Sequence, residues 1–390
     1  METFKHCFGL VLLAIVIYGF DFDELEKKLN RMAKNGEKIN ELFKPMILGT
    51  IGRGGHGFVF RGVNVVGNRP VALKFIPLEE RFKADREFSM YGYLDAINKT
   101  NVEKYGISSL HYYQEWDDFM VSALPLFDGG DLSHKRDYFH HRNASLAINS
   151  LILFRDFVMH SKYIHSRGIR HNSIKPANLV VHTSSSRIFL IDFTSSSKML
   201  ERWPTGSWPY VPRLVTEGFS TPKSEWECFV YLMANINSIE LGWLFNNPFH
   251  GRGISEEQAK LLVLHHLIND TERTISILED APIACPVMKR VFILFAKEAL
   301  INQFELPAYD AIYERIVKEI EKNFGSHCFT WLDDYQRFFA EHDQVRCRNI
   351  RDVPAVPLTF RELNYIEYPF DFFPAPIQKW RSFFGCASCK

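Results

Sequence analysis

The chain has 390 residues, of which 46% are hydrophobic and 24% are charged. This balance is typical of a globular protein with a sizeable core, and it excludes a chain that is mainly disordered. The 46 basic and 46 acidic residues cancel, so the overall charge gives no indication of a nucleic-acid partner or of an anionic membrane surface.

The N-terminus carries an apolar stretch. Lys5 precedes an uncharged run over residues 8–20, and a charged segment follows at once. The run has the length of the apolar part of a signal peptide, whereas a helix that spans a membrane needs about 20 apolar residues. We therefore predict a signal peptide over residues 1–20 and a lumenal or secreted protein of the secretory pathway. The alternative is an N-terminal helix that packs on the domain.

Cysteines and glycosylation motifs agree with export. Removal of residues 1–20 leaves an even number of cysteines, which disulfides can pair. Asn-x-Ser/Thr motifs occur at Asn98, Asn143 and Asn269, so we predict a glycoprotein with disulfide bonds. No later segment reads as a membrane span. The remaining cysteines are Cys228, Cys285, Cys328, Cys347, Cys386 and Cys389.

Strand patterns come first in the chain and helix patterns later. Residues 21–45 predict a charged surface helix and a linker, with Leu25, Leu29 and Met32 on one stripe. Short apolar runs from Met46 to about Ile76, broken by glycines, predict three antiparallel strands.

Helical periodicity dominates from Leu146 onward, and residues 224–237 are apolar nearly all round, as in a buried helix. This order predicts an α+β protein with two lobes.

A glycine-rich motif lies between the first two predicted strands. Gly52, Gly54 and Gly57 are followed by Val59 in the pattern G-x-G-x-x-G-x-V. Glycines allow backbone N–H groups to approach phosphate oxygens closely. The motif alone also fits an ordinary tight hairpin.

A lysine and a glutamate follow this motif. Lys74 lies on the third predicted strand, where its amine suits the α- and β-phosphates of a nucleotide. Glu87 shares a predicted helical stripe with Tyr91 and Leu94, so its carboxylate faces inward and needs a cation. We expect Lys74 to supply that cation.

The sequences "YIHSRGIRHNSIKPANLVV" and "IFLIDFTSS" resemble the catalytic loop and the metal-binding turn of eukaryotic protein kinases. The resemblance covers about residues 46–320. It implies a protein kinase-like fold, with an antiparallel-sheet N-lobe over residues 46–128 and a mainly helical C-lobe over 129–322. The run "SEWECFVYLMANINSIELGW" is similar to the casein kinase I group, especially its tau-tubulin kinase-like members.

Several residues depart from the family pattern. Ser173 stands where the family has the aspartate that accepts the substrate proton, and Lys175 follows it in the loop. Serine is a poor base near neutral pH, so phosphate transfer should be feeble or absent. Asn172 replaces an arginine that pairs with a phosphorylated activation loop, and Glu225 replaces an aspartate. Thr194 replaces a glycine. If the turn requires positive φ at this position, we expect the Cβ of threonine to strain it.

The residues that the family uses to hold ATP and Mg²⁺ are retained. The resemblance assigns the metal to Asn178 and Asp192, and a hinge hydrogen bond to the backbone N–H of Phe127. It assigns the nucleotide to Gly52, Gly54, Gly57, Val59, Ala72, Lys74, Glu87, Phe127, Asn178 and Asp192.

Residues 323–390 form an extension that is rich in aromatic residues and cysteines. Such a segment either wraps the larger lobe or presents an apolar patch to a partner. Disulfides suit its cysteines better than a structural zinc site, because two closely spaced pairs are lacking. A redox-active pair at Cys386 and Cys389 is a further alternative.

Together these features predict a secreted pseudokinase that binds Mg-ATP and regulates or scaffolds a protein partner. Two alternatives remain open. One is an active serine/threonine protein kinase that phosphorylates a protein substrate with an atypical catalytic loop, and the other is an interaction module that binds no nucleotide. The sequence predicts neither a nucleic-acid partner nor a membrane-spanning segment, and it does not indicate an oligomeric state.

Overall fold

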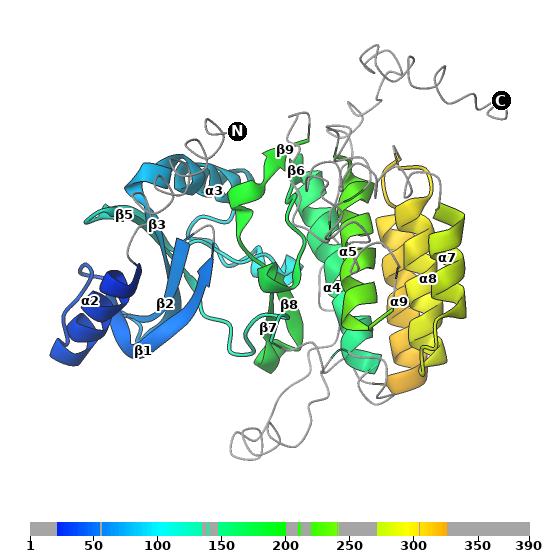
Figure 1. Cartoon of the computed structure of the whole chain (residues 1–390), viewed down its shortest axis with the longest axis horizontal. Coiled ribbons are helices and arrows are strands. Elements are labelled where there is room, and N and C mark those ends of the chain that lie inside the picture. Colours follow the sequence, from blue (N-terminus) through cyan, green and yellow to red (C-terminus); the bar gives the residue numbers. More distant parts are fainter. Residues whose placement is uncertain are drawn as a thin grey trace, which may run out of the picture.

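The structure is a computed structural model, and it has the two-lobed α+β architecture expected of a protein kinase-like fold (Figure 1). It describes residues 22–54, 57–134, 139, 147–199, 210, 212, 220–239, 241, 271–303 and 305–325. The smaller lobe holds α2 (Phe22–Asn35), β1 (Phe43–Gly54), β2 (Gly57–Asn64), β3 (Arg69–Pro77), α3 (Arg81–Tyr93), β4 (Tyr112–Trp116) and β5 (Phe119–Pro125). The larger lobe holds α4 (Ala147–Ser166), β6 (Ile169–Arg170), β7 (Leu179–His182), β8 (Arg187–Leu190), β9 (Ser197–Lys198), α5 (Pro222–Ile236), α7 (Thr271–Asp280), α8 (Pro286–Leu300) and α9 (Tyr309–Phe324).

The small-lobe strands form one antiparallel sheet in the order β1-β2-β3-β5-β4. The three antiparallel strands predicted from the sequence are present, and the first begins at Phe43, slightly before the expected Met46. Side chains alternate between the two faces of a strand. One face of this sheet is aromatic and packs against α2. This helix is amphipathic, and the apolar stripe noted in its sequence faces the sheet. This face and α2 bury Leu25, Leu29, Met32, Phe43, Phe58, Phe60, Val71, Leu73, Phe75, Phe119 and Val121.

The larger lobe is built around two buried helices. α4 is buried from Ala147 to His165, and α5 is buried along nearly all of its length, as predicted. A capping box at Thr221 fixes the start of α5. Ring stacking joins the helices: the ring centroids of Phe157 and Phe229 are 4.0 Å apart. The two-stranded sheet β6–β9 and the short hairpin β7–β8 lie between this bundle and the small lobe (Figure 1).

One expectation about cysteines is wrong for two of them. Cys228 and Cys285 are free thiols buried in the core, so an even number of cysteines does not lead to complete pairing. The other cysteines, the signal-peptide segment, most of the C-terminal extension, Asn143 and Asn269 lie outside the described residues. Asn98 is exposed. Among the residues that the structure describes, no helix is long and apolar enough to cross a membrane.

A histidine in the middle of α4 is held neutral by its surroundings. The His160 ring is fully buried, and its Nε2 donates to the carbonyl of Ile188 at 2.8 Å. A Cβ on Gly106 would lie 2.2 Å from this Nε2, so the ring is tightly confined. Burial lowers the pKa of His160 to about 4, against the opposing charge of Asp156.

We predict that His160 makes the folded state sensitive to mild acid. The unfolded chain takes up a proton on this residue near pH 6.5 and the folded chain only near pH 4. Acidification over that interval therefore favours unfolding, by up to about 3 kcal/mol at its acidic end. Thermal melts of the wild type between pH 7 and pH 4 are compared with those of His160→Gln, which retains a donor for Ile188 but does not titrate. The variant should lose clearly less stability over this interval, and equal slopes would contradict the assignment.

Candidate functional site

Lys74 is the centre of a buried charge cluster. It lies in the middle of β3, opposite Val59 of β2 and Ser122 of β5, on the sheet face that points away from α2. Its Nζ is 2.7 Å from Glu87 Oε2 of α3 and 2.8 Å from Asp192 Oδ1, which follows β8. The pair predicted between Lys74 and Glu87 is thus present. The cluster joins β3 and α3 to a turn that lies 118 residues after Lys74 in the sequence.

Burial and charge oppose each other in this cluster. The side chains of Lys74 and Glu87 are only 9% and 7% exposed. Burial lowers the pKa of Lys74, but the negative charges of Asp192 and Glu87 outweigh that effect and raise it. Burial raises the pKa of Glu87, and Lys74 opposes this rise. Lys74 is therefore a cation at neutral pH, held between two acidic groups.

The turn that carries Asp192 is anchored at each of its residues. Phe193 donates its backbone N–H to Glu87 Oε1 at 3.2 Å, and its buried ring packs edge-on against Tyr91, with centroids 5.2 Å apart. The Thr194 hydroxyl donates to Asp192 Oδ1 at 2.7 Å. These contacts couple the orientation of the acidic side chain to α3 and to the core.

The expected strain at Thr194 is absent. The residue of this turn with positive φ is Asp192, at 64°, and aspartate tolerates that region better than most residues do. Thr194 lies in a short 3₁₀ turn over Phe193–Ser195, where a Cβ is accommodated. The expectation was wrong because the family pattern gives the residue type and not the dihedral angle at each position.

The catalytic loop keeps its shape without an acidic group. The amide nitrogen of Asn178 donates to the Ser173 carbonyl at 2.8 Å and to the Ser173 hydroxyl at 3.2 Å. The backbone N–H of Ile191 donates to the Asn178 carbonyl at 3.0 Å, which places the loop beside Asp192. Lys175 is half-buried in the same loop. Neither Ser173 nor its neighbours in the loop supply a carboxylate.

The glycine motif spans the end of β1 and the start of β2. Gly57 has φ 126°, and a Cβ there would lie 2.3 Å from the Phe75 carbonyl oxygen, so this glycine is needed for β2 to pack on β3. A Cβ on Gly52 would meet only open space. Gly54 pairs with Gly57 across the turn, whose residues 55–56 lie outside the described residues.

The predicted adenine-side residues lie on the inner sheet face and at the hinge. Val59 and Ala72 are half-buried and belong to neighbouring strands. Phe127 follows β5, and its ring stacks on Phe189 of β8 with centroids 4.4 Å apart. The next residue, Asp128, accepts the backbone N–H of Thr183 at 2.8 Å. The segment after β5 is thus fastened to the β7–β8 hairpin.

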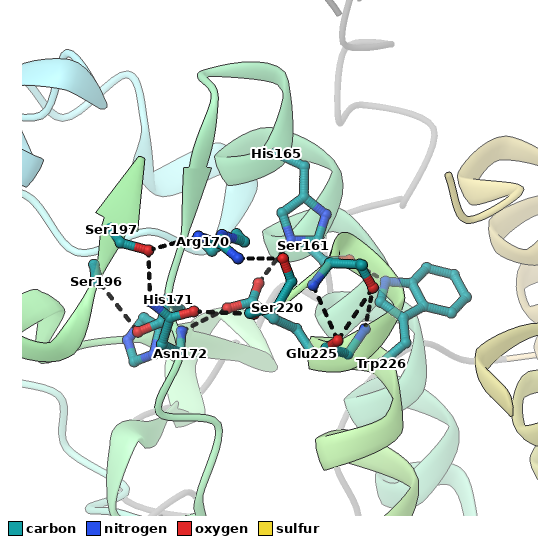
Figure 2. A network of polar contacts seen from close by, with 12 residues as sticks. Ser161, His165, Arg170, His171, Asn172, Ser196, Ser197, Ser220, Glu225 and Trp226 are labelled. Atoms are coloured by element: carbon teal, nitrogen blue, oxygen red, sulfur yellow. Dashed lines mark hydrogen bonds and ion pairs between the residues drawn. The ribbon is translucent and has the colours of Figure 1, made fainter. Parts of the chain in front are cut away.

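Sequence reasoning missed a hydrogen-bond network around Asn172 (Figure 2). Its amide nitrogen donates to the Ser195 carbonyl at 3.1 Å and to the Ser197 hydroxyl at 2.8 Å, and its oxygen accepts from the Ser220 hydroxyl at 3.3 Å. Arg170 donates to the same Ser197 hydroxyl at 3.2 Å. The serine run after the metal-binding turn was the only signal in the sequence for these contacts.

The other side of the loop is held by α5. Glu225 accepts the backbone N–H of Asn172 at 2.6 Å and pairs with His165 of α4 at 2.6 Å, as Figure 2 shows. His165 also contacts the Tyr309 hydroxyl at 2.6 Å. Burial raises the pKa of Glu225, but these partners outweigh it and lower it. Glu225 is therefore a buried carboxylate that connects the loop to three helices.

Comparison with known proteins finds a family model that matches this part of the chain. The protein kinase domain matches residues 46–224. This part of the chain is therefore similar to protein kinase domains. The matched residues include the glycine motif, the charge cluster and the catalytic-loop residues described above, but not Glu225. Typical protein kinases use ATP and Mg²⁺.

Individual relatives of the kinase domain are distant. The chain is 26% identical to casein kinase I homolog 3 of Schizosaccharomyces pombe over 148 residues, which are 37% of this chain and 31% of that protein. It is 28% identical to the probable serine/threonine-protein kinase mkcD of Dictyostelium discoideum over 176 residues, 44% of this chain and 25% of that protein. The match therefore spans a third or less of the length of either relative.

We predict that Asn172 keeps the segment after the metal-binding turn ordered without phosphorylation. Asn172→Gly removes the side chain but tolerates its φ of 60°. Loss of these neutral hydrogen bonds should speed hydrogen exchange at the Ser196 and Met199 amides on the order of tenfold. Asn302→Gly, at an exposed position with φ 53°, is the backbone control. Unchanged exchange in Asn172→Gly would contradict the prediction.

Proposed function

We propose that this protein is a pseudokinase of the casein kinase I-like group, which binds Mg-ATP and acts by presenting a nucleotide-stabilised domain to a protein partner. One observation carries this proposal: Lys74 is held between Glu87 and Asp192 at 2.7 and 2.8 Å, whereas a serine stands at the proton-accepting position. The group assignment is supported by the "SEWECF" run of α5 and by the likeness to a casein kinase I homolog.

The residues present fit a magnesium-bound triphosphate. Because the Asn178 amide nitrogen is bound to Ser173, its oxygen is the atom offered to a cation, and Asp192 adds carboxylate oxygens of the kind that Mg²⁺ prefers. Lys74 supplies a buried positive charge for phosphate oxygens. Open space beside Gly52 leaves the glycine turn accessible to a ligand.

The catalytic loop lacks the group that would use this arrangement for transfer. Bound Mg-ATP supplies a phosphoryl group, and an incoming hydroxyl must then lose its proton as it reacts. Ser173 is neutral near pH 7, and its hydroxyl already accepts a hydrogen bond from Asn178. It can orient a neighbouring group but cannot take up the proton. Loss of a positioned base typically costs about 10²–10⁴-fold in rate.

An active serine/threonine kinase is the second candidate. The assembled Lys74–Glu87 pair favours it, because that pair must be in place for phosphate transfer. The relative mkcD, named above as a probable serine/threonine-protein kinase, also favours it. This candidate relies on substrate positioning and metal alone.

We predict that Mg-ATP stabilises the wild-type protein and that the charge cluster is responsible. At a concentration about 100 times the dissociation constant, the melting temperature should rise by roughly 5–10 °C. Lys74→Met and Asp192→Ala should abolish the rise, since each removes a charge that binds phosphate or metal.

The control for this experiment is Lys223→Met. It removes another buried lysine, which is paired with Glu298 at 3.2 Å far from the cluster, and it should keep the ligand-induced rise. If millimolar Mg-ATP does not change the melting temperature of the wild type, nucleotide binding is refuted. The alternative of an interaction module that binds no nucleotide would then be supported.

We predict that restoring an acidic group creates phosphate transfer. In Ser173→Asp, the Asn178 amide can donate to the new carboxylate as it now does to the hydroxyl. Transfer to a peptide panel or to the protein itself should exceed that of the wild type at least about 100-fold. Ser173→Ala should stay inactive, and Asp192→Ala in the Ser173→Asp background should remove the gain. Wild-type turnover at about 1 s⁻¹ would instead establish the active kinase.

A further inference from the structure

Thr194 is a buried hydroxyl beside the metal-binding carboxylate. Its side chain lies in the core, and its Oγ1 donates to Asp192 Oδ1 at 2.7 Å. The same oxygen accepts from Lys74 Nζ at 2.8 Å. Two donors on one carboxylate oxygen, one of them charged, fix the direction of the carboxylate more firmly than either donor does alone.

The backbone of the turn supports the same orientation. The Phe193 N–H is bound by Glu87 at 3.2 Å, and the Phe193 ring also packs on His171, with centroids 4.8 Å apart. A glycine at position 194 would leave the backbone there free to rotate, whereas threonine restricts it and adds the hydroxyl contact. Residues 192–194 are therefore held by the backbone N–H and the ring of Phe193 and by the side chains of Asp192 and Thr194.

We propose that Thr194 is a positioning residue that holds Asp192 against Lys74 before any ligand binds. The nucleotide-binding face of the cluster is then preformed, and the turn does not pivot between alternative orientations. This proposal rests on the proposed binding of Mg-ATP, because that ligand is what the orientation serves. The contact itself is a property of the ligand-free protein and is open to test without a nucleotide.

The first experiment measures the reactivity of Lys74 in the absence of nucleotide. An amine that is held by carboxylates reacts slowly with an acylating reagent, and Asp192 Oδ1 holds Lys74 Nζ at 2.8 Å. Thr194→Val keeps the shape of the side chain and removes its hydroxyl, so Asp192 should spend more time turned away from the amine. Acylation of Lys74 at pH 9, measured by mass spectrometry, should be about fivefold faster, the equivalent of about 1 kcal/mol for one hydrogen bond. Thr194→Ser, which retains the hydroxyl, should match the wild type.

Lys223 is the internal reference in the same samples. It is also buried and is held by Glu298 and the Ile301 carbonyl, so general loosening of the fold would raise its acylation together with that of Lys74. Faster acylation of Lys74 alone in Thr194→Val supports the positioning role. Equal rates in the wild type and Thr194→Val, equal rates in Thr194→Val and Thr194→Ser, or a parallel rise at Lys223 would overturn it.

The second experiment titrates Mg-ATP against the same variants by thermal shift. Thr194→Val should weaken apparent Mg-ATP affinity about fivefold, and Thr194→Ser should leave it unchanged. The two experiments fail independently. If no variant binds nucleotide but Lys74 responds as expected, the positioning role stands and the proposed function falls. If Mg-ATP binds but Lys74 does not respond to Thr194→Val, the positioning role falls alone.

Discussion

The structure depends on one buried cation between two carboxylates. Glu87 reaches Lys74 because α3 packs with the buried face that carries Glu87 toward the sheet, and Asp192 reaches it because the turn after β8 is held in place. A buried pair that loses one partner typically costs about 3–5 kcal/mol, since a charge is then left uncompensated. The arrangement of the two lobes and the charge balance of the cluster therefore support each other.

Around this cluster the catalytic loop is held by hydrogen bonds, and residues 171–178 carry no carboxylate. Asn178 still binds the residue at the proton-accepting position, although that residue is now a serine. Asn172 binds the following segment through neutral groups where the family has a charged residue. Glu225 extends far enough to reach both the loop backbone and His165. At Ser173 and Asn172 hydrogen bonds between neutral groups stand where the family has charged residues, whereas Glu225 remains a carboxylate.

Local patterns in the sequence predicted the parts of the structure that local patterns determine. The helical stripe through Glu87 indicated that its carboxylate points inward, and Lys74 on the third predicted strand was the cation expected to meet it. The buried character of α5 followed from its apolar residues on all sides. The two lobes followed from strands early in the chain and helices later.

The remaining features depend on dihedral angles and on contacts between distant residues. Nothing near Thr194 in the sequence shows that positive φ falls on Asp192 instead. Nothing near Asn172 shows that Ser220 lies beside it, because the two are joined only when α5 packs against the loop. The even number of cysteines does not show which of them lie close together. Cys228 and Cys285 are both buried as free thiols.

The helix α2 has a consequence for recognition. It covers the aromatic face of the small-lobe sheet with its own apolar stripe, and Lys28 adds an ion pair to Asp117 at the β4–β5 turn. That face is therefore already occupied from within the chain. A protein that binds the small lobe must therefore contact another face. Phe82 and Tyr93, the exposed aromatic residues of α3, lie on one such face.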